Sequence, residues 1–235
     1  MIAARKVYET DAAAVVALDD VDLDIDAGAF TAIMGPSGSG KSTLMHCLAG
    51  LDRLTSGAVH VGDADLTTMT DRDLTLLRRE KIGFVFQAFN LIPALSAQEN
   101  ITLPLALSGR TPDEAALHDL ADVLGLTGRL HHRPAELSGG QQQRVAVARA
   151  LVGQPEIVFA DEPTGNLDTA TGTEILGFMR RAVDERAQTT VMVTHDPSAA
   201  AWADRVVFIV DGRVHDELHD PSSDEILDRM RGLAR

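Results

Sequence analysis

The sequence is poor in several residue types, and each shortage excludes a class of protein. The single cysteine, Cys47, allows neither an internal disulfide nor a cysteine-based zinc site. The longest uninterrupted apolar run covers only residues 12–18, whereas a membrane-spanning helix needs roughly 18 or more. No apolar stretch of signal-peptide length follows Arg5 and Lys6 at the N-terminus. We therefore expect a protein that stays in the cytoplasm and crosses no membrane.

Positive charge is also scarce. The chain has 21 Lys and Arg against 35 Asp and Glu, which gives a net charge of −14. Such a surface repels the phosphates of nucleic acids and anionic lipid head groups, so we expect no nucleic-acid partner. Any bound phosphate must be held locally, by backbone N–H groups and a few placed cations. Cys47 lies among Leu44, Met45 and Leu48 and is expected to be a buried apolar residue.

The 235 residues suffice for one large domain, and short apolar runs predict its central strands. These runs cover 29–34, 82–86, 157–160, 189–193 and 206–210. Residues 20–26 alternate aspartate with Val21, Leu23 and Ile25, which predicts a half-exposed strand. Together with its neighbours, that strand indicates an antiparallel layer in the N-terminal third. Asp211-Gly212 predicts a hairpin turn, and Asp220-Pro221 predicts the start of a final helix.

The stretch between the strands 82–86 and 157–160 has a helical pattern. Ser96 to Glu99 and Thr111 to Glu114 both have the form of a capping box, with Pro112 at a first helical position. Apolar residues then repeat at helical spacing, at positions 117, 120, 121 and 124. We therefore predict a single domain, 1–235, in which segments 1–86 and 156–235 form an α/β core with the β layer. Residues 88–155 form an inserted helical lobe.

A phosphate-binding loop follows the first predicted core strand. The run Gly35-Pro36-Ser37-Gly38-Ser39-Gly40-Lys41-Ser42 matches G-x-x-x-x-G-K-[ST] and opens a predicted helix, 41–49. Glycines let backbone N–H groups converge on phosphate oxygens, and the helix N-terminus adds its positive end. Lys41, one of three lysines, is placed to meet the β- and γ-phosphates, Ser42 to ligate Mg²⁺ and Thr43 to reach the α-phosphate. A glycine-rich turn without a ligand is the alternative. The motif alone fits kinases, GTPases and many ATPases.

A second glycine-containing motif narrows the choice. Leu137-Ser138-Gly139-Gly140-Gln141 stands at the start of a strong helix pattern that runs to Leu151. By itself this is equally an ordinary helix cap, with Ser138 as the capping residue. Together with the phosphate loop, the motif resembles the signature of the ABC (ATP-binding cassette) ATPases, and the resemblance extends over nearly the whole chain. It implies a P-loop NTPase (RecA-like) fold, with ATP and Mg²⁺ as ligands.

Other positions match motifs of that family, and the resemblance implies their roles. Asp161 and Glu162, after an apolar strand, resemble the Walker B pair, in which Asp161 holds Mg²⁺ through water and Glu162 is the general base. Gln87 resembles the Q-loop glutamine that contacts Mg²⁺ and senses the transmembrane partner. His195 resembles the switch histidine that contacts the γ-phosphate. Taken singly, each residue also has an ordinary structural interpretation.

The same resemblance implies roles for Asp168 and Tyr8 and predicts a homodimer. Asp168, in Asn166-Leu167-Asp168, resembles the D-loop aspartate at the dimer interface. Tyr8, the only tyrosine, lies where an aromatic residue stacks on adenine. In this family the signature of one subunit, here Ser138 to Gln141, closes over the ATP held by the other. The resemblance thus implies an ATP-dependent homodimer on a membrane subunit at the cytoplasmic face of the cell membrane.

Three stretches, 32–41, 83–93 and 161–168, resemble the lipoprotein-releasing, macrolide-exporting and cell-division branch. That branch implies ATP-driven export, extraction of lipids or lipoproteins, or mechanical signalling through a membrane partner. Phe89, Leu91, Ile92 and Pro93 are expected either to receive a helix of that partner or to pack into the helical lobe.

Two other functional classes stay open at this stage. A soluble ABC-type ATPase, such as one in iron–sulfur cluster assembly, is the alternative. DNA-repair members are disfavoured because they insert a long coiled coil, whereas only about 50 residues separate Gln87 from Leu137. A small-molecule P-loop kinase leaves the signature and His195 unexplained.

Overall fold

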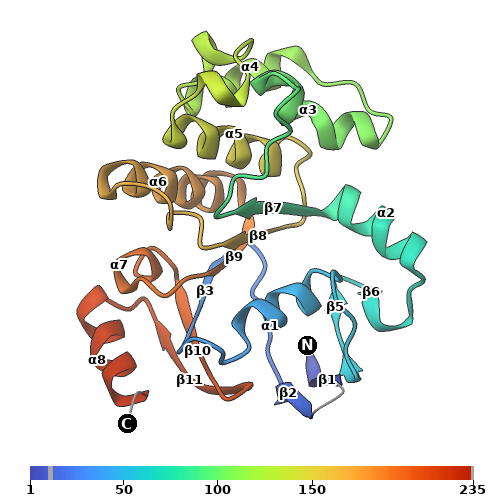
Figure 1. Cartoon of the computed structure of the whole chain (residues 1–235), viewed down its shortest axis with the longest axis vertical. Helices are drawn as coiled ribbons and strands as arrows, with labels where there is room; N and C mark the ends of the chain where they lie inside the picture. Colours follow the sequence, from blue (N-terminus) through green and yellow to red (C-terminus); the bar gives the residue numbers. More distant parts are fainter. Residues whose placement is uncertain (10–12, 234–235) are drawn as a thin grey trace.

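The computed structural model describes residues 1–9 and 13–233 of the chain. At its centre is a six-stranded sheet with the order β11-β10-β3-β9-β8-β7 (Figure 1). Five of the strands run parallel, and β11 pairs antiparallel with β10 at one edge. The bounds are β3 (Phe30–Met34), β7 (Ile82–Phe86), β8 (Ile157–Asp161), β9 (Thr189–Val193), β10 (Arg205–Val210) and β11 (Arg213–His219). The five predicted core strands are confirmed.

The five parallel strands are buried on both faces, which explains why they are nearly continuous apolar runs rather than alternating ones, whereas the edge strand β11 is polar and partly exposed. Successive residues contribute to two different clusters. Phe30, Ala32 and Met34 face one cluster, whereas Ile33 of the same strand faces the other. The first cluster also contains residues of α5 (Gly139–Leu151), α6 (Thr169–Arg186), α7 (Pro197–Ala200) and α8 (Ser223–Leu233).

The second face of the sheet is covered by α1 (Lys41–Leu48) and the antiparallel layer. That layer has the order β2-β1-β4, from β2 (Ala14–Val21), β1 (Ile2–Glu9) and β4 (Ser56–Ala58), and its pairs are antiparallel. The short strands β5 (His60–Val61) and β6 (Ala64–Asp65) form a hairpin beside it. The predicted N-terminal antiparallel layer is therefore confirmed.

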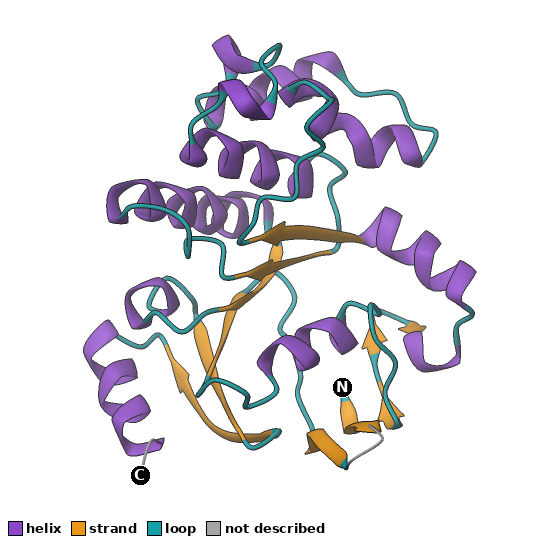
Figure 2. Ribbon diagram, in the orientation of Figure 1, coloured by secondary structure: helices purple, strands orange, loops and turns teal. Residues whose placement is uncertain are grey.

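The middle of the chain is helical, as predicted. Helices α3 (Ala97–Leu107), α4 (Glu114–Val123) and α5 lie together at the top of Figure 1, above α6. Figure 2 shows no strand among them, and α2 (Asp71–Lys81) extends on one side of the core. Three 3-10 turns complete the elements, at Leu66–Thr68, Thr127–Arg129 and Pro134–Glu136. Among the helices of the described residues, none is both long and apolar enough to cross a membrane.

Three local predictions need correction. The strand expected over 20–26 ends at Val21, although the burial alternation continues through Leu23 and Leu23 still exchanges two backbone hydrogen bonds with Met1, at 2.8 and 3.1 Å. The predicted capping box from Thr111 was wrong. Asp113 caps α4 by accepting from the backbone N–H of residues 115 and 116, and Pro112 lies before the helix. The final helix begins at Ser223, two residues after the predicted Asp-Pro start.

Other local predictions are confirmed. Ser96 and Glu99 form a reciprocal capping box at the start of α3. The turn between β10 and β11 consists of Asp211 and Gly212, both with positive φ, 48° and 73°, as a tight hairpin turn requires.

Candidate nucleotide site

The carboxyl ends of four parallel strands meet at one edge of the central sheet. In register, Phe86 of β7 faces Asp161 of β8, which faces Val193 of β9. Val193 in turn faces Ile33 of β3, whose strand leads into the phosphate loop. Gln87, Glu162, His195 and Gly35 therefore emerge side by side from segments that are distant in sequence. Ligands of open parallel sheets bind at this kind of edge.

The phosphate loop is packed against neighbouring backbone at Gly35 and Gly40 and is open at Gly38. An added Cβ on Gly35 would lie 2.0 Å from Ile209 O, and one on Gly40 would lie 2.3 Å from Ala17 O. Both residues also have positive φ, 149° and 100°. Any other residue would therefore be disfavoured here by its backbone conformation as well as by the steric clash. A Cβ on Gly38 would meet nothing within 4 Å. Helix α1 has no side-chain cap at Gly40, so its first N–H groups are available to phosphate oxygens.

Lys41 bends back over this loop. Its ammonium donates to the carbonyl oxygens of Gly35 at 2.9 Å and Pro36 at 2.7 Å. Burial lowers the pKa of Lys41, and the nearby carboxylates of Glu162 and Asp161 act in the opposite direction. The Ser39 hydroxyl is buried and has no hydrogen-bond partner among the described residues. A phosphate oxygen would satisfy both groups, so the loop fits a nucleotide.

The two carboxylates after β8 have different environments. Burial raises the pKa of Asp161, with Glu162 adding to the effect while His46 and Lys41 oppose it. Glu162 has a left-handed backbone, φ 46°, held by its N–H bond to Val193 O at 2.9 Å. Its side chain contacts His195 Nδ1 at 2.6 Å and accepts from Thr194 Oγ1 at 3.3 Å. Strained backbone at a non-glycine residue is common at functional sites.

Gln87 is tied to the loop after β8. Asn166 Nδ2 donates to Gln87 O at 2.9 Å, and Gln87 Nε2 donates to Asn166 Oδ1 at 3.3 Å. Asp168, two residues further on, caps helix α6 by accepting from the N–H and the hydroxyl of Thr171. These hydrogen bonds lower the pKa of Asp168. Asp168 therefore has a structural partner in its own chain.

The signature segment lies at the start of α5, next to the Gln87 and Asp168 loops. Ser138 and Gln141 form a reciprocal capping box, so the ordinary cap and the motif coincide. A Cβ on Gly140 would lie 2.5 Å from Thr171 Cγ2, so this glycine is required for the packing of α5 on α6. Among the described residues no hydrogen bond joins 138–141 to the phosphate loop. Within the described part of the chain, the signature therefore does not close over its own phosphate loop.

Tyr8 is the only predicted site residue contributed by the antiparallel layer. The residue is 38% exposed, and its hydroxyl donates to Asp52 Oδ2 at 2.6 Å and also interacts with Thr43 of α1. Lys6 Nζ donates to the other oxygen of Asp52 at 2.6 Å and lies 4.7 Å from the centroid of the Tyr8 ring. The ring is thereby fixed beside the helix that follows the phosphate loop.

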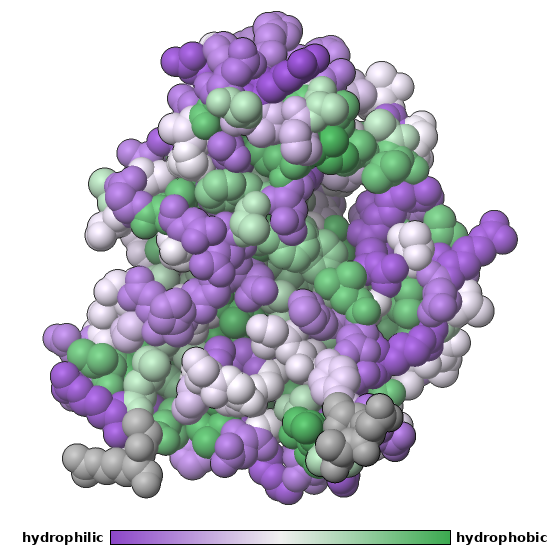
Figure 3. All heavy atoms as spheres, viewed as in Figure 1, coloured by the Kyte–Doolittle hydropathy of each residue, from purple (hydrophilic) through white to green (hydrophobic). Residues whose placement is uncertain are grey.

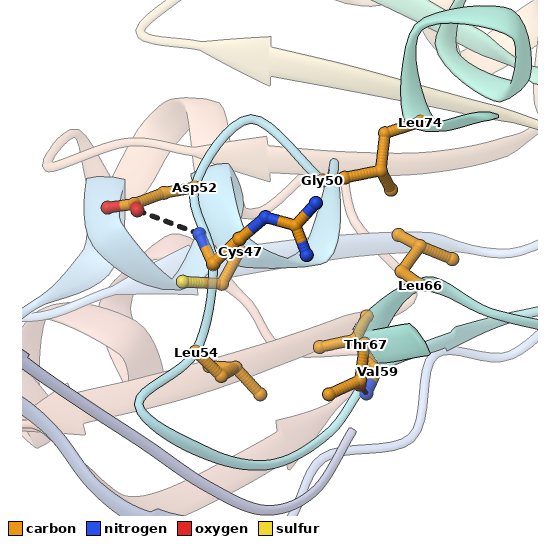
Figure 4. A pocket seen from close by; sticks show the side chains of 9 residues that line it. Cys47, Gly50, Asp52, Leu54, Val59, Leu66, Thr67 and Leu74 are labelled. Atoms are coloured by element: carbon orange, nitrogen blue, oxygen red, sulfur yellow. Dashed lines mark hydrogen bonds between the residues drawn. The ribbon is translucent and has the colours of Figure 1, made fainter. Parts of the chain in front are cut away.

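Behind this network lies a small pocket of about 70 Å³ (Figure 4). Cys47 lines it together with Leu54, Val59, Leu66 and Leu74. Burial raises the pKa of Cys47 to about 12. The thiol is therefore an inert packing group, as the sequence predicted.

Two residues that organise these loops carry no signal in the sequence. Arg149 of α5 donates to Asn90 O at 2.6 Å and Phe89 O at 2.9 Å, and thus fixes two consecutive residues with positive φ. Gln143 of the same helix is buried and donates to Pro163 O at 2.5 Å. Their partners are 59 and 60 positions away for Arg149 and 20 for Gln143, so no local pattern reveals them.

Comparison with known proteins decides the family. The model of the ABC transporter family matches residues 18–165, which is more than half of the chain. The chain belongs to the ABC transporter family. It is an ATP-binding, ATP-hydrolysing subunit of the cassette type, with the α/β P-loop NTPase fold that the sequence resemblance implied.

Relatives of this ABC ATPase come from bacteria and archaea. The uncharacterized ABC transporter ATP-binding protein MJ0796 of Methanocaldococcus jannaschii is 45% identical over 219 residues, 90% of this chain and 93% of the relative. The corresponding protein YvcR of Bacillus subtilis is 46% identical over 205 residues, 86% and 79% of the two chains. The macrolide export ATP-binding/permease protein MacB of Syntrophobacter fumaroxidans is 46% identical over 91% of this chain but only 30% of its own length.

The ABC ATPase also resembles solved cassettes. A dimeric structure of MJ0796 in a post-hydrolysis state with ADP and Pi superposes with a TM-score of 0.85 at 40% identity, covering 94% of this chain and 98% of that one. The likeness extends over both the sheet core and the helical part. The macrolide-export branch indicated by the sequence is supported by the MacB relatives, and iron–sulfur assembly is not favoured.

Proposed function

We propose that this ABC ATPase binds Mg²⁺–ATP at the carboxyl edge of its central sheet and couples closure of a homodimer to a membrane subunit. The observation that carries the proposal is the meeting of Gly35, Gln87, Glu162 and His195 at that edge, with Glu162 and His195 in contact at 2.6 Å. A phosphate loop, a carboxylate base and a second polar group are the parts that phosphoryl transfer to water requires.

The nucleotide-binding roles follow from position. The backbone N–H groups of residues 35–43, except Pro36, which has none, receive the phosphates. Lys41 supplies a point charge to the β- and γ-phosphates, and Thr43 meets the α-phosphate. Tyr8 stacks on adenine, because its partly exposed ring lies beside α1 and is fixed by Asp52.

The oxygen donors Ser42, Gln87 and Asp161 would hold Mg²⁺. They are hard ligands, and a small protein donor set suits this ion because phosphates and waters complete its coordination. Within the described residues no cluster of three His, Cys, Asp or Glu offers a metal site of another kind. When bound, Mg²⁺ neutralises phosphate charge and orients the γ-phosphate.

Glu162 is the general base of the proposed mechanism. Its carboxylate accepts the proton of the attacking water, and its left-handed backbone fixes its direction. His195, whose Nδ1 is held by Glu162, directs its other ring nitrogen to the γ-phosphate. Lys41 and the loop N–H groups stabilise the charge on the transferred group.

We infer that two copies of the chain complete each site. The signature 138–141 lies at a partly exposed helix N-terminus that the side chains of its own Ser138 and Gln141 cap, and it has no hydrogen bond to its own phosphate loop within the described residues. An ATP bound to one copy would be closed by Ser138, Gly139, Gly140 and Gln141 of the other, with Asp168 near the interface. The dimeric structures of a relative that covers 94% of this chain support that arrangement.

The helical segment 88–155 is proposed to act as a lobe that carries the signature toward the partner, with 1–86 and 156–235 as the core. These ranges include residues 10–12 and 234–235, which lie outside the described residues. Lobe and core share one hydrophobic cluster, so we expect small shifts rather than independent folding.

A membrane subunit would dock in the groove between α2, β7, α3 and α5. The groove has a volume of about 510 Å³ and is lined by Phe84, Phe86, Leu103, Pro104 and Leu107, with Arg79 and Arg149 at its polar side. Figure 3 shows hydrophobic surface at the hollow between the upper helices and α2. Leu107 is 62% exposed and Leu51 46% exposed, and both line the groove, so a partner's apolar side chains could pack on them.

The occupant is inferred from the relatives and from the groove. MacB proteins carry a permease in the same chain as their ATP-binding part, and this chain matches only 30% of them. We therefore propose an integral membrane subunit as partner, which would place this chain at the cytoplasmic face of the membrane. Of the predicted loop, Leu91 packs on the core cluster, whereas Ile92 is 41% exposed and does not line the groove.

The test is co-purification from detergent extract. Leu107→Glu should abolish association with an integral membrane protein without lowering basal ATPase activity, because a charge is costly in an apolar groove. Val123→Glu is the matched control, since Val123 is 51% exposed on α4 and does not line the groove. Partners without membrane spans, held equally by both variants, would instead support a soluble ABC machine.

A further inference from the structure

Gln87 and Asn166 form a two-point contact between loops that are 79 positions apart. Gln87 directly follows β7, and Asn166 lies between β8 and the cap of α6. One hydrogen bond runs from the Asn166 amide to the Gln87 backbone carbonyl at 2.9 Å. The other runs from the Gln87 amide to Asn166 Oδ1 at 3.3 Å.

The chemistry of these groups fixes the orientation of both amides. A backbone carbonyl can only accept, so the NH₂ of Asn166 must face Gln87 O. Oδ1 of Asn166 then faces the Gln87 side chain and can only accept, so the NH₂ of Gln87 must face Asn166. The remaining atom, Gln87 Oε1, accepts no hydrogen bond from any described residue. Gln87 thus presents an oxygen, not an NH₂, as its free group.

The neighbouring residue adds a steric constraint. A Cβ on Gly165 would lie 2.7 Å from Gln87 Nε2 and 3.1 Å from its Cδ. Gly165 has no positive φ, so its backbone accepts another residue and only the Gln87 side chain opposes one. The loop 165–166 therefore packs against the Gln87 amide and also hydrogen-bonds to it.

We propose that Asn166 is a positioning residue that orients the Gln87 amide so that Oε1 is available to Mg²⁺. This rests on the proposed role of Gln87 as a metal ligand. An unoriented amide would present its NH₂ for part of the time, and NH₂ cannot ligate a cation. Because Asn166 lies two residues from Asp168, the contact also links the metal ligand to the loop expected at the dimer interface. Partners that orient metal ligands commonly contribute to metal affinity, because they hold the ligand atom in place.

The experiment measures metal affinity rather than turnover. All variants carry Glu162→Gln, so that ATP is not consumed, and Mn²⁺ replaces Mg²⁺ so that bound and free metal are counted by electron paramagnetic resonance. Asn166→Ala should weaken Mn²⁺ binding to the ATP complex by about 2- to 12-fold, the bias that one hydrogen bond gives an equilibrium. ATP affinity in EDTA and the Tm should stay unchanged, because Asn166 is exposed.

A second variant reaches the same amide differently. Gly165→Ala leaves Asn166 in place but displaces the Gln87 side chain, so it should weaken Mn²⁺ binding in the same range. In the Gln87→Ala background, both Asn166→Ala and Gly165→Ala should have no further effect, because the amide they orient is gone.

The outcomes separate the two levels of inference. If Gln87→Ala leaves Mn²⁺ affinity unchanged, Gln87 is not a ligand and the proposed metal site is wrong. If Gln87→Ala weakens affinity but Asn166→Ala does not, the metal site stands and the positioning role of Asn166 is wrong. An undiminished effect of Asn166→Ala in the Gln87→Ala background also overturns that role, since Asn166 would then act on the metal by another route.

Discussion

His195 Nδ1 lies 2.6 Å from Glu162 Oε1, although the two residues are 33 positions apart. An ionised carboxylate can only accept, so the shared hydrogen belongs to Nδ1. The contact thus fixes which ring nitrogen of His195 remains for another partner. It also holds the carboxylate that we propose as general base, with Thr194 as a second donor at 3.3 Å.

The tautomer of His195 is the first prediction. Neutral His195 should be protonated at Nδ1, whereas free histidine favours Nε2. The ¹⁵N chemical shifts of the imidazole, measured on labelled protein without nucleotide, report this directly. Glu162→Ala should restore the Nε2–H form, because the acceptor is lost. A predominant Nε2–H tautomer in the wild type would contradict the Glu162 contact.

Lys41 and Glu162 should fail in different ways when substituted. Lys41→Ala removes a phosphate contact and should weaken ATP binding at least tenfold, the loss expected for one charge-assisted hydrogen bond. Glu162→Gln keeps the shape of the side chain but cannot accept a proton, so binding should persist while kcat falls by about 10²-fold or more. Calorimetry and phosphate release measure the two effects. Equal loss of ATP binding in both variants would remove this division of roles.

Dimer formation should depend on ATP and on the signature. The Glu162→Gln chain with Mg²⁺–ATP should elute as a dimer on a sizing column, and with ADP as a monomer, because the γ-phosphate bridges the two copies. Without nucleotide the net charge of −14 per chain opposes pairing.

Ser138→Arg provides the complementary arm of the dimer test. Its long side chain fills the space for the phosphate at the α5 N-terminus, so the Glu162→Gln dimer should disappear. Two results together would contradict pairing of the isolated chain: the Glu162→Gln variant stays monomeric at high ATP and low salt, and the ATPase rate of the wild type is first order in protein. Pairing would then need the membrane subunit.

Tyr8 should affect substrate affinity rather than turnover. Tyr8→Ala should raise KM for ATP by roughly 5- to 100-fold, since base stacking contributes ~1–3 kcal/mol in related settings. Tyr8→Phe is the matched control, because it keeps the ring and loses only the hydrogen bond to Asp52. Its KM should rise less. An unchanged KM in a folded Tyr8→Ala variant would place Tyr8 outside the site.

The ionised Asp161 carboxylate should lower the free energy of unfolding of the nucleotide-free protein. Burial raises its pKa, so the folded chain holds the proton more tightly than the unfolded chain. Stability therefore falls as pH rises from the ordinary aspartate pKa through the raised one, and the cost is complete above that window. Asp161→Asn should raise the Tm at neutral pH, because the amide carries no charge to bury. The difference should vanish in acid, below the window.

Asp161→Asn should also weaken the binding of Mg²⁺ together with ATP. Mg²⁺–ATP should stabilise the wild type against heat more than it stabilises Asp161→Asn, because a neutral amide is a weaker Mg²⁺ ligand. Thermal scans with and without Mg²⁺–ATP measure this. A larger ligand-induced shift in the variant would argue against Asp161 as part of the metal site.

The sequence by itself determined the central strands, the phosphate loop and the family. Apolar runs such as 189–193 and 206–210 specify strands because a parallel sheet buried on both faces tolerates few polar residues. The glycine spacing at 35–40 is a local signal as far as the positive φ of Gly35, Gly38 and Gly40 is concerned. The close approach of Ile209 O to Gly35 and of Ala17 O to Gly40 comes from the tertiary structure. The boundaries that failed, at 20–26 and 111–114, depend on where regular strand pairing ends and on which of several polar residues caps a helix.

Only the tertiary structure decided how distant residues meet. The contact of Glu162 with His195 exists because β8 and β9 are neighbours in register, and the contact of Gln87 with Asn166 because the loops after β7 and β8 leave the same edge. Arg149 fixes the Phe89–Asn90 turn by donating to both carbonyl oxygens from α5. It reaches that turn because α5 packs beside it, and no local sequence pattern predicts the contact. Such contacts follow from strand order and helix packing, which no short stretch of sequence encodes.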